Sequence, residues 1–241
     1  MTNIQWEELC DLHRGETGII IGNGPSLKDV SDAELKAYPS FGTNKIFMRI
    51  GFAPDYYACT NPYVLSQSMN ELAAWNKPIK FVREGVENLL PLCLPLHIVQ
   101  SLEKPAFSFR PDHHIYEGFT ITYVCLQLAF YMGFSTILLY GIDHRYIAKG
   151  KPNEPVEAEG PDQNHFHPEY FSNGDMWQLP DLEEAEKRYE LAKRIYENHN
   201  RKIYNLTIGS RLTIFERIDN AECQEFRECK TNRADQISEL V

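Results

Sequence analysis

The chain has 241 residues, of which 43% are hydrophobic, and it carries a formal net charge of −10. This length and composition suit a globular α/β protein with a substantial buried core. The negative charge argues against a protein that binds nucleic acid through a broad basic surface, because such binding depends on the displacement of counterions.

The first strand is predicted at residues 19–21, an apolar and β-branched run typical of a strand buried on both faces of a parallel sheet. It leads into the turn Gly22-Asn23-Gly24-Pro25-Ser26. The two glycines predict a backbone that turns sharply and comes close to a ligand, at the strand end where open α/β sheets bind ligands. The turn matches neither the dinucleotide nor the Walker motif. An ordinary strand-to-helix turn is the alternative interpretation.

Strand and helix signals then alternate along the chain. A capping box at residues 31–34 predicts a short helix, and Pro62 predicts the start of a helix that continues to Trp75. Further strands are predicted at residues 41–43, 56–60, 79–82 and 96–99.

The second half continues the alternation. Gly133 is suited to the C-terminus of an apolar helix at residues 119–132. A strand at 136–140, a long loop at 147–180, a charged helix at 181–196 and a last strand at 201–206 follow in that order.

This order of elements predicts a doubly wound, mainly parallel, Rossmann-like sheet. We expect one α/β domain over residues 1–221, in which residues 147–180 form a lid, and a polar tail at residues 222–241. The part of the lid at residues 149–161 has little apolar content, so we expect it to be mobile without a ligand. Closure of the lid would exclude water from the site.

The location of the protein is constrained by what the sequence lacks. The apolar stretch at residues 119–134 is too short to span a bilayer, and the first residues do not resemble a signal peptide. Six cysteines without CxxC spacing favour a reducing compartment. We therefore expect a cytoplasmic protein, either free or peripheral at the inner membrane surface, and we leave open whether it forms a homo-oligomer.

Polar residues follow the predicted strands at corresponding positions. They are Asn23, Asn44, Asn61, Asp143 and Asn205. If the strands are parallel, these side chains share one rim, where amides could bind a sugar, a base edge and a phosphate. Any single asparagine could instead be an ordinary turn residue.

The segment 160–171 is the second candidate for chemistry. His165 and His167, with Glu169 and Tyr170 beyond them, could supply a general base near neutral pH. A metal site is a second interpretation, although no third ligand is obvious. A structural loop that closes over the core is the third.

The ordered set of motifs resembles two related families of proteins. The motifs are Gly22-Asn-Gly-Pro-Ser-Leu27, Thr43-Asn44, Thr60-Asn61-Pro62, Gly133-Phe-Ser-Thr-Ile-Leu-Leu-Tyr-Gly-Ile-Asp143 and the histidine loop, within residues 17–218. One family is the Campylobacter-type lipooligosaccharide sialyltransferases. The other is named for an archaeal 6-hydroxymethylpterin diphosphokinase and includes the central domain of motility-associated flagellin glycosylation proteins (Maf proteins). The resemblance implies a Rossmann-like, GT-A-like fold.

The sialyltransferase resemblance implies that Asn23, Asn44 and Asn61 contact a cytidine monophosphate (CMP) donor. The family's Thr-Ser-Gly motif is Thr120-Ile-Thr122 in this chain, and the arginine before it is replaced by Gly118. The family's phosphate-binding tyrosines fall in the region of Arg145 and Tyr146, which do not align cleanly with them. Its catalytic base corresponds to His165 or His167.

These observations together give a functional hypothesis. We expect a metal-independent glycosyltransferase that moves a nonulosonic acid from a CMP-linked donor to a cell-surface glycan or glycoprotein. Hydrogen bonds from the Gly22–Ser26 turn, and from hydroxyls such as those of Tyr146 and Tyr170, would stabilise the leaving phosphate. The donor-binding residues would be Gly22, Asn23, Gly24, Pro25, Ser26, Asn44, Asn61, Thr120, Thr122, Gly141, Asp143, Arg145 and Tyr146.

Two alternatives stay open beside this hypothesis. A diphosphokinase would transfer pyrophosphate from ATP to a pterin-like alcohol, with Mg²⁺ held by carboxylates such as Asp143, Asp162 and Glu169. A non-catalytic nucleotide- or glycan-binding module would keep the rim without turnover.

Overall fold

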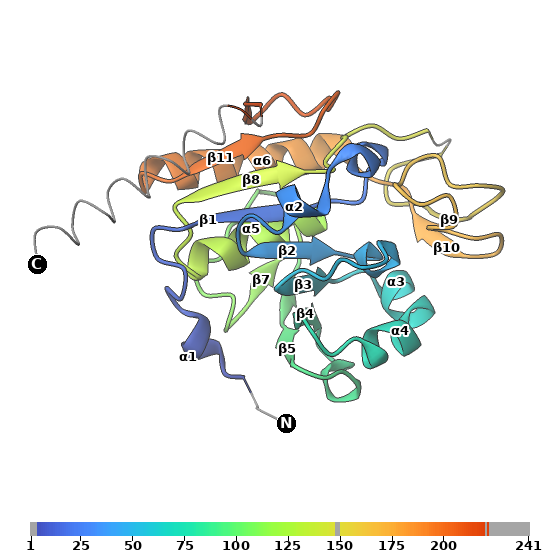
Figure 1. Ribbon diagram of the computed structural model, residues 1–241, viewed down its shortest axis with the longest axis horizontal. Helices are drawn as coiled ribbons and strands as arrows, with labels where there is room; N and C mark the ends of the chain where they lie inside the picture. The colour runs from blue at the N-terminus through green and yellow to red at the C-terminus, as the bar shows by residue number, and fades with distance from the viewer. Residues whose placement is uncertain (1–3, 148–149, 220, 222–241) are drawn as a thin grey trace, which may run out of the picture.

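The computed structural model describes residues 4–147, 150–219 and 221, so the expected tail at 222–241 and part of the expected mobile segment lie outside the described residues. Within them, eight strands form one sheet in the order β12-β11-β8-β1-β2-β3-β4-β5, and each neighbouring pair is parallel. The strands are β1 (Thr17–Ile21), β2 (Ser40–Thr43), β3 (Tyr56–Cys59), β4 (Ile79–Arg83), β5 (Cys93–Leu96), β8 (Thr136–Tyr140), β11 (Lys202–Asn205) and β12 (Glu216–Arg217). The prediction of a mainly parallel α/β sheet is confirmed (Figure 1).

The order of the strands reverses beside β1. The chain adds β2 to β5 on one side of β1 and then returns to place β8 and β11 on the other side. In open parallel sheets, ligands bind in the crevice at the carboxyl ends of the two strands where the order reverses. Here these ends are the turn after Ile21 and the turn after Tyr140.

Helices cover both faces of the sheet. Successive residues of β1 point to opposite faces, so Ile20 packs in one core while Ile19 and Ile21 pack in another. The first core is covered by α1 (Trp6–Leu9), α5 (Ile121–Tyr131) and α6 (Leu182–Asn198). The second is covered by η1 (Pro25–Asp29), α2 (Asp32–Leu35), η2 (Ile46–Met48), α3 (Pro62–Gln67), α4 (Met69–Ala74) and the region of η3 (Glu87–Leu89). In the described part of the chain, no helix is both long and apolar enough to cross a membrane.

Two elements in the first half differ from the sequence-based prediction. The helix expected up to Trp75 breaks at Ser68, whose φ of −123° and ψ of 19° lie outside the helical range and separate α3 from α4. The strand expected at 96–99 is also divided. β5 ends at Leu96, and β6 (Ile98–Val99) pairs instead with β7 (Ile115–Tyr116) in a separate small sheet. Pro95 is accommodated because β5 is an edge strand.

The segment 147–180 is not a structureless loop. It carries β9 (Pro155–Glu157) and β10 (Met176–Gln178), which form an antiparallel pair. This pair lies beyond the ends toward which the sheet strands point (Figure 1). Phe166, Tyr170 and Phe171 are buried in the second core, so the segment is anchored to the sheet by aromatic side chains.

Candidate functional site

A cavity of about 610 Å³ lies at the carboxyl ends of β8, β1, β2, β3 and β4. Most of the residues that the sequence singled out line it. These are Gly22, Asn23, Gly24, Asn44, Asn61, Thr120, Thr122, Gly141, Asp143, Arg145, Tyr146, His165 and Tyr170. The cavity lining does not include Pro25, Ser26, Asn205, His167 or Glu169.

The turn after β1 is fastened to the turn after β8. The buried Asp143 carboxylate accepts hydrogen bonds from the Ser26 hydroxyl at 2.6 Å and from the Ser26 backbone N–H at 3.3 Å. A Cβ on Gly24 would clash with this carboxylate, and a Cβ on Gly22 would clash with Ile142. These glycines therefore have a structural role beside the close approach of a ligand, which stays a prediction. The structure shows that they allow two strand ends to approach each other.

This arrangement also changes the expected role of the turn as a phosphate cradle. The backbone N–H of Gly22 donates to Tyr140, that of Gly24 donates to Gly141, and that of Ser26 donates to Asp143. Pro25 has no N–H to donate. These three groups are paired inside the protein, so the turn offers a phosphate fewer backbone donors than expected.

Asn23 presents a hydrogen-bond acceptor whose orientation is fixed by its neighbours. The Thr43 hydroxyl donates to the Ile21 carbonyl at 2.9 Å, so the Thr43 oxygen must accept from the Asn23 Nδ2, also at 2.9 Å. Asn23 Nδ2 donates to the Thr43 carbonyl as well. Asn23 Oδ1 is buried and has no hydrogen-bond partner within the described residues. A buried acceptor without a partner is costly, which suits a site that receives a donor from a ligand.

Asn44, at the end of β2, repeats this feature. Its φ of +47° places it in the left-handed region that asparagine tolerates better than most residues. Its Oδ1 is a second buried amide oxygen without a partner among the described residues, and Asn44 lines the same cavity. The two residues follow the neighbouring strands β1 and β2, and we call their amide oxygens the acceptor pair.

The other two asparagines stabilise local structure. Asn61 caps α3, because its Oδ1 accepts the backbone N–H groups of Tyr63 and Val64. Asn205 is 1% exposed and donates to Ser210 and to the Leu212 carbonyl. The expectation that Asn205 shares the cavity is therefore wrong, since its side chain organises the loop that follows β11.

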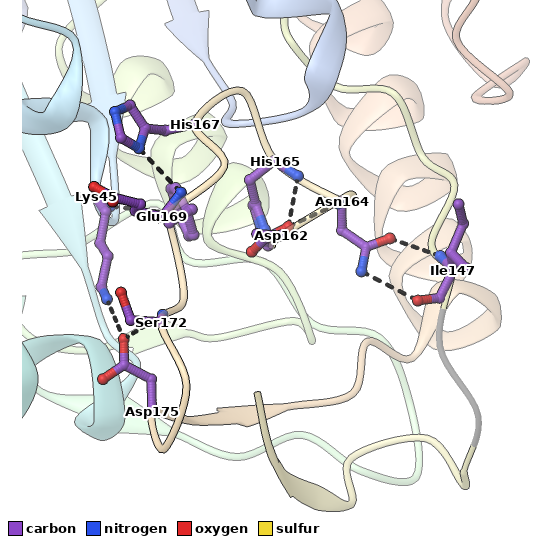
Figure 2. A network of polar contacts seen from close by, with 10 residues as sticks. Lys45, Ile147, Asp162, Asn164, His165, His167, Glu169, Ser172 and Asp175 are labelled. Atoms are coloured by element: carbon purple, nitrogen blue, oxygen red, sulfur yellow. Dashed lines mark hydrogen bonds and ion pairs between the residues drawn. The ribbon is translucent and has the colours of Figure 1, made fainter. Parts of the chain in front are cut away.

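His165 is held in a defined orientation at the cavity. Its Nδ1 lies 2.8 Å from Asp162 Oδ2, and its backbone N–H donates to Asp162 Oδ1 at 3.0 Å (Figure 2). Burial alone would raise the pKa of Asp162, but the hydrogen bond and charge of His165, with the backbone N–H groups of Asn164 and His165, hold that pKa below its usual value. An ionised carboxylate at Nδ1 favours the tautomer in which Nε2 can accept a proton.

The Tyr170 ring supports the other side of this arrangement. It stacks on His165 with 3.9 Å between ring centroids and an angle of 5° between ring planes. Its hydroxyl accepts the backbone N–H of Lys45 at 3.2 Å, and burial raises its pKa well above the ordinary value. The Lys45 ammonium lies 3.3 Å from Asp175 and 4.8 Å from the centre of the Phe171 ring. Tyr170 therefore positions His165, and its hydroxyl is already engaged.

His167 has a different environment from His165. Its Nδ1 accepts the backbone N–H of Glu169 at 3.2 Å, and it lies on the opposite side of the loop from the Asp162 carboxylate (Figure 2). The sequence left His165 and His167 equivalent. The structure places only His165 at the cavity with an acidic partner.

A second wall of the cavity comes from the N-terminus of α5. Thr120 caps this helix and also lies 3.2 Å from the Tyr189 hydroxyl of α6. The backbone N–H groups at the start of a helix attract anions. Nearby, Arg145 lies 3.7 Å from Asp143, and His144 pairs with Glu186 at 2.9 Å. This wall is the part of the cavity best suited to a phosphate.

The carboxylates considered for Mg²⁺ are not assembled into one group. Asp143 is engaged by Ser26 and Arg145, Asp162 is engaged by His165, and Glu169 lies outside the cavity. Within the described part of the chain, no three metal-ligating side chains come together. The three carboxylates considered for the ion therefore do not act together as one Mg²⁺ site.

Sequence reasoning missed the contact between Asp162 and His165, and it missed several residues of the cavity. It considered Asp162 only as a metal ligand, although its spacing of three residues from His165 on a tight turn was the available signal. Arg83, Gln100, Glu117 and Tyr189 were not singled out, because each is an isolated polar or aromatic residue without a motif.

The fold is similar to that of a known structure, the MAf glycosyltransferase from Magnetospirillum magneticum AMB-1. The TM-score is 0.52 at 16% sequence identity, and the alignment covers 87% of this chain but 34% of that one, so the chain spans about a third of that protein's length. At this identity the likeness shows the fold alone. A search of curated proteins found no match.

A family model matches more than half of this chain. The model is described as 6-hydroxymethylpterin diphosphokinase MptE-like, and it matches residues 1–149. The matched stretch contains β1 to β8 and both turns that meet at Asp143, and it ends before His165. On this match, the chain belongs to the MptE-like family.

Proposed function

We propose that the protein is a glycosyltransferase that uses a nucleotide-activated sugar, with His165 as the general base. The observation that carries this proposal is the pairing of His165 with Asp162 at the edge of the cavity. A histidine whose Nδ1 is held by a carboxylate is oriented to take a proton at Nε2. The MAf glycosyltransferase fold and the earlier motif resemblance add support.

The donor would bind along the rim between β8 and β2. Asn23 Oδ1 and Asn44 Oδ1 can accept hydrogen bonds from ribose hydroxyls or a base amino group, whereas a phosphate offers no such donors. The phosphate would lie at the N-terminus of α5, close to Arg145. We propose a CMP-linked nonulosonic acid as the donor. Its monophosphate leaving group needs less countercharge than a diphosphate, in keeping with the absence of a carboxylate cluster from the described residues.

The proposed reaction is a single displacement. An acceptor hydroxyl gives its proton to His165 Nε2 while its oxygen forms a bond to the anomeric carbon of the donor sugar. The bond between that carbon and the phosphate oxygen breaks, and CMP leaves with the electron pair. Positive potential at the start of α5 would stabilise the charge that develops on the phosphate.

A diphosphokinase is the second candidate, favoured by the description of the family model. It would transfer pyrophosphate from ATP to a pterin-like alcohol, a reaction that normally depends on Mg²⁺ held against the phosphates. The scattered positions of Asp143, Asp162 and Glu169 speak against this candidate.

The two candidates differ in the ligand that should stabilise the folded protein. We would measure the thermal midpoint with CMP, CDP and ATP, each with Mg²⁺ and with a chelator. Stabilisation by CMP in chelator, followed by release of CMP from a CMP-sugar donor, is the result expected for the transferase. Stabilisation by ATP only in the presence of Mg²⁺ would contradict the transferase proposal and favour the diphosphokinase. CMP binding without any transfer or hydrolysis would indicate a non-catalytic module.

A further inference from the structure

The cavity extends well beyond the acceptor pair of Asn23 and Asn44. It reaches from the end of β8 to Arg83 at the end of β4, across the carboxyl ends of five neighbouring strands. Adjacent strands lie about 4.8 Å apart, so this distance is roughly 19 Å. Such a length accommodates a nucleotide and a further ring side by side. The far end is lined by Arg83, Gln100, Glu117 and Phe119, which we call the Phe119 subsite.

Phe119 has an unusual backbone conformation. Its φ is +62°, and the preceding Gly118 has a φ of +65°. A bulky residue with positive φ is strained, and such strain clusters at sites where a ligand is held. Position 118 must also be glycine because a Cβ there would clash with the Tyr123 ring. The strained backbone at Phe119 therefore places its aromatic ring at the cavity.

The Phe119 ring packs against Arg188 of α6. The Arg188 guanidinium lies 4.7 Å from the centre of the Phe119 ring. Arg188 is 2% exposed, donates to the Ser101 carbonyl at 2.7 Å and pairs with Glu184. A fully buried arginine with these fixed partners makes the ring a rigid platform rather than a mobile surface side chain.

The polar residues of the Phe119 subsite carry almost no net charge, because Arg83 is paired with Glu117. Arg83 donates through Nε to the Thr60 carbonyl at 2.9 Å and through Nη2 to Glu117 at 3.0 Å. The other oxygen of Glu117 accepts from Gln100 at 2.8 Å. Paired opposite charges provide both donors and acceptors without a strong net potential, which suits hydroxyl groups better than a phosphate.

We propose that the Phe119 subsite binds a pyranose ring of the acceptor glycan. The apolar face of the sugar packs on the Phe119 ring, and its hydroxyls bind Arg83, Gln100 and Glu117. This assignment rests on the proposed transferase function and goes further, because it assigns the acceptor to the end of the cavity away from the strand-order reversal.

Direct binding measurements separate this inference from the transferase proposal. Saturation-transfer NMR would be recorded on the full chain with methyl glycosides of galactose, glucose and N-acetylglucosamine, with and without CMP. We expect at least one glycoside to bind. Phe119→Leu should weaken that binding about tenfold, as expected for the loss of an aromatic contact, and Phe119→Tyr should retain it. Arg83→Gln should weaken the same glycoside without changing CMP affinity.

Each outcome bears on one of the two proposals. Thermal midpoints and CMP binding of the Phe119→Leu variant show whether it is folded, and the Phe119→Tyr variant gives a conservative control. CMP binding without binding of any glycoside, or glycoside binding unchanged in both Phe119→Leu and Arg83→Gln, overturns the inference. Glycoside binding that needs Phe119 in a protein that does not bind CMP supports the subsite, while the transferase proposal fails.

Discussion

Phe166 donates its backbone N–H to the carbonyl oxygen of Asn23 at 2.8 Å. The residue next to the histidine is thus attached to the residue that presents the unpaired amide oxygen. The two halves of the candidate site, the strand end and the histidine loop, are therefore joined directly. This backbone contact, together with the hydrogen bond from Lys45 to Tyr170, sets the position of Asn23 relative to His165.

His165→Ala should lower the rate of sugar transfer by about 10²–10⁴-fold, the usual contribution of a general base. CMP binding should change little, because the acceptor pair is formed by other residues. His167→Ala is a matched control from the same loop, and its turnover should stay near that of the unmodified protein. Steady-state kinetics and calorimetric titration with CMP measure both effects. A larger loss of turnover in His167→Ala than in His165→Ala would reverse the assignment.

Asp162 should make stability depend on pH in the acidic range. Its pKa is lowered in the folded protein, so its ionised form stabilises the fold above the ordinary aspartate pKa of about 3.9. That stabilisation is lost as the pH falls through the lower folded-state value. The difference in unfolding free energy between the unmodified protein and Asp162→Asn should therefore shrink as the pH falls from 6 to 3. Urea unfolding at several pH values measures it, and a constant difference would contradict the expectation.

Asn44→Gly should weaken nucleotide binding without lowering the stability of the fold. Removal of a buried oxygen without a partner relieves a desolvation penalty, and glycine accepts the positive φ, so the unfolding free energy should stay constant or rise slightly. Nucleotide affinity should nevertheless fall about tenfold, the equivalent of one hydrogen bond.

Asn61→Ala provides the contrast to this variant. It removes the cap of α3 and should cost about 0.5–2 kcal/mol of stability. Denaturation and CMP titration of both variants make the comparison. A clear loss of stability in Asn44→Gly would mean that its amide oxygen has an important structural role.

The sequence predicted those strands that are buried on both faces of the sheet, because almost all of their residues are apolar. The runs at Ile19–Ile21 and at β8 were predicted as strands because nearly all of their residues are apolar, and their neighbours proved to be parallel strands. The turn residues after them pointed to the edge of the sheet where the cavity lies. Such features depend on residues that are neighbours in sequence, so the sequence pattern alone can predict them.

Features that depend on contacts between residues far apart in the sequence could not be predicted from the sequence. The break at Ser68, the pairing of β9 with β10 and the burial of Asn205 each depend on what packs against the element. His165 and His167 have similar neighbours in sequence, so their difference appears only when the loop closes on Asn23. The Phe119 subsite combines residues from β4, the segment before α5 and the loop between them, without any motif.

Gly24→Ala should destabilise the protein by about 1–3 kcal/mol, because the new methyl group meets the Asp143 carboxylate in a packed region. The cost should be smaller in a chain that also carries Asp143→Ala, since the clashing group is then removed. Urea unfolding of the two single variants and the double variant gives the coupling energy. Additive effects would show that the clash is not the source of the instability.

The pairing of β1 with β8 also has a consequence for the growing chain on the ribosome. Thr17 pairs with Thr136, so one edge of the entirely buried strand β1 has no permanent neighbour until residues 136–140 have been synthesised. Open edges of this kind recruit other chains, and pairings between distant segments form slowly. Nascent chains that stop before residue 136 should therefore need chaperone protection, and the rim around Asn23 can form only after this strand has received its partner.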